Sequence, residues 1–346
     1  MPPNHNLLDF RLERAAIQAE FDQTLLSVSS DCSAVSQRLM SHVGLRHGQD
    51  SLMWMDQFSS LVLLYPTYQA SCLGGLSGSL IRRANVAHLC FLIYAFVDDR
   101  RRDRQVELDE TESRFVDDLM SIGCAILQKF PFRGSKLSVE TRIVAETRKQ
   151  LFDDHSDTFD FVFDDRERAL SLIAVDRAML GYFSTAVLAS VVASESPVFQ
   201  HLVDSYFLLV LGMQWIDDAE DWKEDLTLGD SNLLLESMKT RKLIAIGPRP
   251  LSTIMRDVSR AFVETDALDY AILKADTCFA RALTIQADLD CNQLTMQLEI
   301  IRNRLPLARR RMKRRAAEEF SGSSSMDILN SLRLRNMQVS NRADSN

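Results

Sequence analysis

An all-helical protein is predicted by the scarcity of turn-forming residues and by the three-to-four-residue spacing of apolar side chains. The 346 residues include only 12 glycines and 8 prolines, too few to punctuate a fold of many short strands. No proline lies between Pro66 and Pro131, which leaves a long uninterrupted segment. Further along, Leu202, Tyr206 and Leu209 recur at the spacing of one helical face.

The same apolar spacing predicts where each helix lies. Helices are expected at about residues 9–27, 32–44, 50–64, 79–99, 110–130, 137–154, 164–194, 198–226, 231–245, 250–268 and 273–302. Residues 1–70 are expected to add N-terminal helices to one large bundle whose main part is residues 71–315. Residues 302–315 hold eight arginines or lysines, and a serine-rich stretch follows at 321–325. Residues 316–346 are therefore expected to form a mobile polar tail.

Composition and charge exclude several classes of protein. The hydrophobic share of 46% supports a sizeable core, and the net charge of −8 argues against a nucleic-acid-binding protein, which needs a basic face. The six cysteines form neither a CxxC pair nor a zinc-spaced cluster, so most are expected to be buried free thiols in a reducing compartment. Residues 1–10 lack the features of a signal peptide, and the most apolar stretch, Val86–Val97, is too short to span a membrane. A cytoplasmic protein without membrane spans is predicted.

The first acidic segment, Asp98-Asp99-Arg-Arg-Arg-Asp103, ends the apolar helix expected at 79–99. Asp99 and Asp103 are one helical turn apart, so their carboxylates share a face with Asp98 beside them. Like charges at this spacing repel each other and call for a counter-charge. The segment is therefore a candidate for binding a cation.

The second acidic segment runs from Asp217 to Asp225 and closes another long apolar helix. Asp217, Asp221 and Asp225 are spaced i, i+4, i+8, and a second register on nearly the same face begins at Asp218 and includes Glu224. Oxygen donors without histidine or cysteine suit Mg2+. Because two such segments each end a long apolar helix, a metal site is favoured over a merely solvated acidic face. The other Asp-Asp pairs, at 117–118, 153–154 and 164–165, are interpreted as solvated surface.

The two segments resemble the motifs of the class I isoprenoid (terpene) synthase superfamily, an all-helical bundle. Residues 98–103 are similar to its DDxxxD motif. Residues 217–221 are similar to the DDxxD motif of trans-prenyl diphosphate synthases, and residues 221–225 to the DxxED motif of squalene and phytoene synthases and some bacterial terpene synthases. Gln214 and the run that begins at Asn232 also fit the pattern, and the resemblance covers roughly residues 75–245.

The resemblance implies the identity of the site residues. It implies three Mg2+ ions held by Asp98, Asp99, Asp103, Asp217, Asp221 and Asp225, with Asp218 and Glu224 as further catalytic carboxylates. Arg177 lies near the position of a basic diphosphate contact in the family, and Arg177, Arg82, Arg102 and Lys223 are candidates for binding the diphosphate of an allylic isoprenoid substrate. A carbocation needs an apolar, aromatic pocket, and Phe91, Tyr94, Gly181, Tyr182 and Trp215 are candidates for its lining, with simple core packing as the alternative for the aromatic residues. Members of the superfamily often form homodimers, so a homodimer is implied here too.

Within the superfamily, chain-elongating enzymes carry a basic motif about 40 residues before the first acidic motif. Here the window at 50–65 has no basic residue, and the first lysine of the chain is Lys129. This departure favours a terpene cyclase that releases inorganic diphosphate from one substrate. The alternatives are a trans-prenyl diphosphate synthase, a squalene/phytoene-synthase-like prenyltransferase, or a helical scaffold without catalytic activity.

Overall fold

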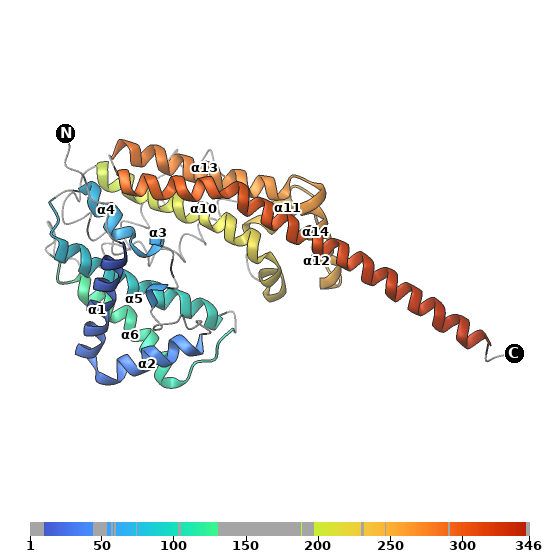
Figure 1. Cartoon of the computed structure of the whole chain (residues 1–346), viewed down its shortest axis with the longest axis horizontal. Helices are drawn as coiled ribbons and strands as arrows, with labels where there is room; N and C mark the ends of the chain where they lie inside the picture. Colours follow the sequence, from blue (N-terminus) through green and yellow to red (C-terminus); the bar gives the residue numbers. More distant parts are fainter. Residues whose placement is uncertain are drawn as a thin grey trace. The chain divides into compact units, whose positions relative to one another are not determined.

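The computed structural model describes residues 10–43, 54–56, 58, 60–73, 75–102, 105–130, 188, 197–229, 232–245, 247–289 and 291–343, and these form helices and loops without a strand. The helices are α1 (Phe10–Val28), α2 (Ser30–His42), η1 (Trp54–Asp56), α3 (Ser60–Leu63), α4 (Tyr65–Leu73), α5 (Gly78–Arg102), α6 (Glu110–Leu127), α10 (Pro197–Leu228), α11 (Leu233–Thr240), α12 (Leu251–Glu264), α13 (Ala267–Asp288) and α14 (Asn292–Ala343) (Figure 1). The all-α prediction is confirmed. The helices expected at 137–154 and 164–194 lie outside the described residues, apart from Leu188.

The described residues separate into two compact units. The first unit comprises residues 10–130, 197–210 and 280–299, and the second comprises residues 211–279 and 300–343. The predicted boundaries at residues 70 and 315 stay predictions. In the structure, α4 spans the first of these positions and α14 the second.

In the first unit, α5 packs against α6, α4 and α1. Its residues from Ala84 to Phe91 are all buried, which explains why nearly every position there is apolar. By length and composition α5 is the one helix of the described residues that could cross a membrane, but 56% of its most apolar window is buried in the protein. The absence of a membrane span stays a prediction.

In the second unit, the part of α10 that begins at Leu211 packs against α13. Gly212 lies so close to Phe279 of α13 that a methyl group added to it would be 2.5 Å from the ring. One turn further on, Trp215 makes an edge-to-face contact with Tyr270, with ring centroids 6.0 Å apart. The glycine therefore allows two long helices to approach closely at a fixed register.

We expect Gly212→Ala to lower the free energy of unfolding by about 1–2 kcal/mol, because overpacking exceeds the gain in helix propensity. Gly78→Ala is the control, since a methyl group there has open space around it, and it should be neutral or slightly stabilising. Urea denaturation measures both. Equal stabilities for the two variants would contradict the close packing of α10 and α13.

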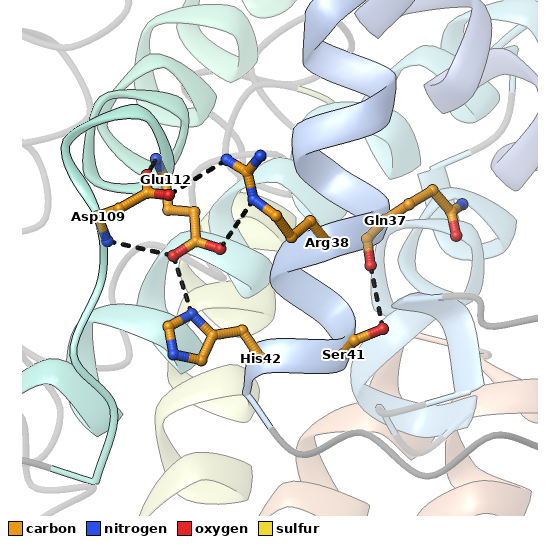
Figure 2. A network of polar contacts seen from close by, with 6 residues as sticks. All are labelled: Gln37, Arg38, Ser41, His42, Asp109 and Glu112. Carbon is orange, nitrogen blue, oxygen red and sulfur yellow. Dashed lines mark hydrogen bonds and ion pairs between the residues drawn. The ribbon is translucent and has the colours of Figure 1, made fainter.

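The N-terminus of α6 is held by a buried glutamate. Asp109 accepts a hydrogen bond from the Glu112 backbone at 2.8 Å, and the Glu112 carboxylate accepts one from the Asp109 backbone at 3.2 Å, which is a capping box. Figure 2 shows the same carboxylate between Arg38 and His42 of α2, at 3.4 and 2.9 Å. One side chain thus both caps α6 and ties it to α2.

Glu112→Ala is expected to lower the free energy of unfolding by about 1–3 kcal/mol, because it removes the cap and the charge-assisted bonds to α2. Glu112→Gln keeps the capping box and should cost less. Glu110, an exposed residue in the same turn that pairs with Arg114, is the control, and its replacement by alanine should change stability by less than about 0.5 kcal/mol. Thermal unfolding distinguishes the three variants.

The C-terminal region differs from the sequence prediction. The single helix expected at 273–302 is two helices, since α13 ends at Asp288 and α14 begins at Asn292. Asp and Asn favour helix ends over helix interiors. Residues 316–343, expected as a polar tail, continue α14, which runs as one helix past Pro306 to Ala343 (Figure 1). Residues 302–317 are mostly Arg, Lys, Leu, Met and Ala, which are strong helix formers. Their summed helix propensity outweighs the cost of Pro306 inside the helix.

The cysteines also differ in part from the prediction. Cys72, in α4, and Cys291, at the start of α14, form a disulfide with their Cα atoms 5.1 Å apart. The expectation of free thiols is wrong for this pair, which the sequence separates by 219 positions. It is confirmed for Cys90, Cys124 and Cys278, which are free and buried, and Cys32 is free and half-buried.

Candidate functional site

The first acidic segment lies in the last turns of α5, in the first unit. Asp98 is 5% exposed and accepts a hydrogen bond of 2.6 Å from Arg101, whereas Asp99 is exposed. Arg100 lies over the Phe96 ring at 4.6 Å and donates to the Val43 carbonyl. Arg100 and Arg101 therefore have partners within the fold, and of Asp98 and Asp99, the two carboxylates of the segment that the structure describes, Asp99 is the exposed one.

The second acidic segment forms the end of α10, in the second unit. Asp217 and Asp221 are exposed and Asp225 is half-buried, so the i, i+4, i+8 row lies along an accessible face of the helix. Desolvation and the neighbouring charges of Glu220 and Glu224 raise the pKa of Asp221 above its usual value. A bound cation would offset the repulsion that these neighbouring charges exert on the Asp221 carboxylate.

Asp218 lies off this row, and its expected place among the catalytic carboxylates stays a prediction. It is 3% exposed, and one of its oxygens accepts a hydrogen bond of 2.5 Å from Gln214, one turn earlier. The other accepts from the backbone N–H of Leu233, the first residue of α11. Burial is the main cause that raises the pKa of Asp218, to about 7. Its role is to join α11 to α10.

Asn232 completes the junction between α10 and α11. Its amide nitrogen donates to the Asp218 carbonyl at 2.9 Å and to the Asp225 carboxylate at 2.6 Å. Its amide oxygen accepts from the Leu235 backbone at 2.8 Å and so caps α11. The sequence includes Asn232 in the family pattern but gives it no role, because its partners lie across a loop.

Two residues expected to bind diphosphate have other surroundings in the structure. Lys223 forms an ion pair with Glu319 of α14 and lies 5.5 Å from the centre of the Trp222 ring. Arg82 is half-buried in α5, and its Nε atom has no hydrogen-bond partner among the described residues. A role for Lys223 in binding diphosphate requires it to leave Glu319.

The expected pocket aromatics that the structure describes belong mainly to the core. Phe91 is fully buried, and its ring lies so close to Gly123 of α6 that no side chain would fit between them. Trp215 is also fully buried against Tyr270, while Tyr94 is half-buried. Tyr94 is therefore the one of these three with part of its side chain accessible.

Several predicted residues lie outside what the structure describes. They are Asp103, Arg177, Gly181 and Tyr182, together with the side chain of Arg102. Their proposed parts in binding metal, diphosphate or the isoprenoid chain stay predictions.

The basic region of α14 lies along the second acidic segment. Arg311 pairs with Glu220, the residue directly before Asp221, and Glu319 pairs with Lys223. Two further pairs, Arg302 with Asp276 and Arg309 with Asp269, tie α14 to α13. The Arg309 guanidinium lowers the pKa of Asp269. Three of the eight basic residues at 302–315 thus pair with acidic residues of α10 or α13.

The donor chemistry of the second segment fits Mg2+. Among the residues that the structure describes, no three His, Cys, Asp or Glu side chains converge on one point. Mg2+ requires no such cage, because it commonly takes one or two carboxylates, several waters and the oxygens of a bound phosphate. Exposed Asp217 and Asp221 supply carboxylates of this kind without a competing nitrogen or sulfur ligand.

Comparison with known proteins identifies the fold. The chain is similar in structure to a geranylgeranyl pyrophosphate synthetase from the archaeon Geoglobus acetivorans, with a TM-score of 0.61 over 85% of this chain and 99% of that chain. The two sequences are 15% identical, a level at which the likeness shows the fold alone. The sequence matches no protein-family model and no curated protein.

Proposed function

We propose that this chain, which has the all-helical fold of the isoprenoid synthases, is a Mg2+-dependent class I terpene synthase. The reaction would ionise an allylic isoprenoid diphosphate and release inorganic diphosphate. The observation that carries the proposal is the accessible row of Asp217, Asp221 and Asp225 at the end of a long apolar helix in this fold. An acidic helix face that is merely solvated needs no buried contacts to fix its position. Here the buried hydrogen bonds of Asp218 and Asn232 fix the end of α10 that carries the row.

The bond that breaks joins the allylic carbon to a diphosphate oxygen, and its electron pair leaves with the diphosphate. Mg2+, when bound, neutralises the charge that develops on this leaving group. Asp217, Asp221 and Asp225 would hold the ions from α10. A metal-binding role for Asp99, which belongs to the first unit, stays a prediction from the sequence. In a cyclase, a double bond of the same substrate attacks the cation, which forms a carbon–carbon bond and leaves the positive charge on another carbon. Loss of a proton from a neighbouring carbon then gives the neutral hydrocarbon.

A prenyltransferase is the second candidate, because the similar solved structure is of a geranylgeranyl pyrophosphate synthetase. Such an enzyme transfers the cation to a second substrate, isopentenyl diphosphate, whose diphosphate needs its own basic site. No arginine, lysine or histidine occurs at residues 50–65, where the resemblance places that site. The lack of basic residues in this window favours the cyclase.

The test is to incubate the purified chain with geranyl, farnesyl and geranylgeranyl diphosphate singly, with Mg2+ and then with EDTA, and to identify products by mass spectrometry. A hydrocarbon or alcohol that forms from one diphosphate alone and is lost with EDTA supports the cyclase. A longer prenyl diphosphate that forms only with isopentenyl diphosphate supports the prenyltransferase. No Mg2+-dependent turnover under either condition would overturn both proposals.

A further inference from the structure

The two N–H bonds of the Asn232 amide connect the α10–α11 junction to the carboxylate row. Asn232 is 2% exposed, so its hydrogen bonds form away from competing water. One N–H reaches the backbone of the buried Asp218, and the other reaches the Asp225 carboxylate at 2.6 Å. The same side chain therefore contacts a fixed point of α10 and the half-buried end of the row.

The loop between the two helices brings Asn232 back to α10. Gly229 ends α10 in the left-handed region, at φ 80°, and its backbone N–H donates to the Asp225 carbonyl at 2.8 Å. The chain then returns so that the Leu233 N–H reaches Asp218 and the Asn232 side chain reaches Asp225. Asp225 is thus held at both its main chain and its side chain.

We infer that Asn232 is a positioning residue that orients the Asp225 carboxylate for metal binding. This inference rests on the proposed function, since it takes Asp225 to be a ligand of the ion. Carboxylate ligands are commonly fixed by such outer hydrogen bonds, and loss of one typically costs about 10- to 100-fold in metal affinity. Asn232 touches neither metal nor substrate and acts through Asp225.

Asn232→Ser distinguishes this role from helix capping. Serine caps a helix about as well as asparagine, so the bond to the Leu235 N–H can be kept, but its short hydroxyl cannot replace the amide N–H groups that reach Asp218 and Asp225. A residue that only caps α11 should tolerate serine without change in metal binding. A residue that orients Asp225 should not.

The experiment measures Mn2+ binding to the full chain, with inorganic diphosphate present and absent, by the loss of the free-ion electron paramagnetic resonance signal. We expect Asn232→Ser to raise the Mn2+ dissociation constant about 10- to 100-fold and to lower the melting temperature without metal, because two buried hydrogen bonds are lost. In an Asp225→Asn background the same substitution should have almost no further effect, because its target is gone. Wild-type affinity in Asn232→Ser, or an undiminished effect in the Asp225→Asn background, overturns the inference.

This measurement separates the inference from the proposed function. Wild type that binds Mn2+ but turns over no isoprenoid diphosphate would refute the function, while the comparison of affinities still decides the role of Asn232. Wild type that binds no Mn2+, even with diphosphate present, would overturn both.

Discussion

Asp221→Asn is expected to lower Mg2+-dependent release of diphosphate by about 10²- to 10⁴-fold. A metal ion supplies several kcal/mol of charge stabilisation to a leaving group, and each 1.4 kcal/mol or so is tenfold in rate. Asp221 is exposed at the centre of the carboxylate row, so asparagine removes a ligand charge without opening the core. Single-turnover kinetics at saturating Mg2+ would measure the loss in the chemical step.

Asp117→Asn is the matched control, because Asp117 also belongs to an Asp-Asp pair and is exposed on a helix, α6. It should keep wild-type activity. Both variants should retain the wild-type free energy of unfolding to within about 0.5 kcal/mol. Mg2+ should raise the melting temperature of wild type and of Asp117→Asn more than that of Asp221→Asn. Equal activity of the two variants would remove Asp221 from the site.

The long apolar helices could be predicted because their signal is local. The pattern placed α5 and α10 within a few residues of their ends, and the turn-poor composition excluded a strand-rich fold. The break at residues 289–291 and the disulfide were missed for different reasons. The break is marked in the sequence only by Asp and Asn residues at the two helix ends, and the pairing of Cys72 with Cys291 depends on a contact between residues 219 positions apart.

The register of the second acidic segment could not be predicted from spacing. Rows that begin at Asp217 and at Asp218 both fit a helical face, so the sequence left the two registers open. What separates them is the Leu233 N–H, which reaches Asp218 from another helix. The local part of the signal was Gln214, an amide one turn before the buried carboxylate. The ion pairs of α14 with this segment are equally non-local.

Asp218→Ala is expected to lower the free energy of unfolding by about 2–4 kcal/mol, the largest effect on stability expected of any carboxylate in the segment. It leaves the buried Leu233 N–H and the Gln214 amide without their acceptor, and each unsatisfied buried group costs about 1–3 kcal/mol. Asp218→Asn should lower the free energy of unfolding by less. The oxygen of the new amide can still accept from the Leu233 N–H, and the Gln214 amide can turn so that its oxygen accepts from the new NH2 group. Asp217→Ala, one residue earlier and exposed, should cost little.

The pH dependence of stability gives Asp218 a second signature. Its pKa is about 7 in the folded chain, against an ordinary value of 3.8, so the folded state keeps a proton that the unfolded state has lost between these values. The stabilisation from this group is fully present below about pH 4 and is lost as the pH rises through 7.

The amide that Asp218→Asn introduces cannot titrate, so the stability of wild type relative to this variant should fall as the pH rises from 5 to 8. Urea denaturation in EDTA measures this without bound metal. A difference that stays constant over this range would show that Asp218 is already ionised in the folded protein. The junction would then be a charged acceptor for α11, and Asp218→Asn should be destabilising at every pH.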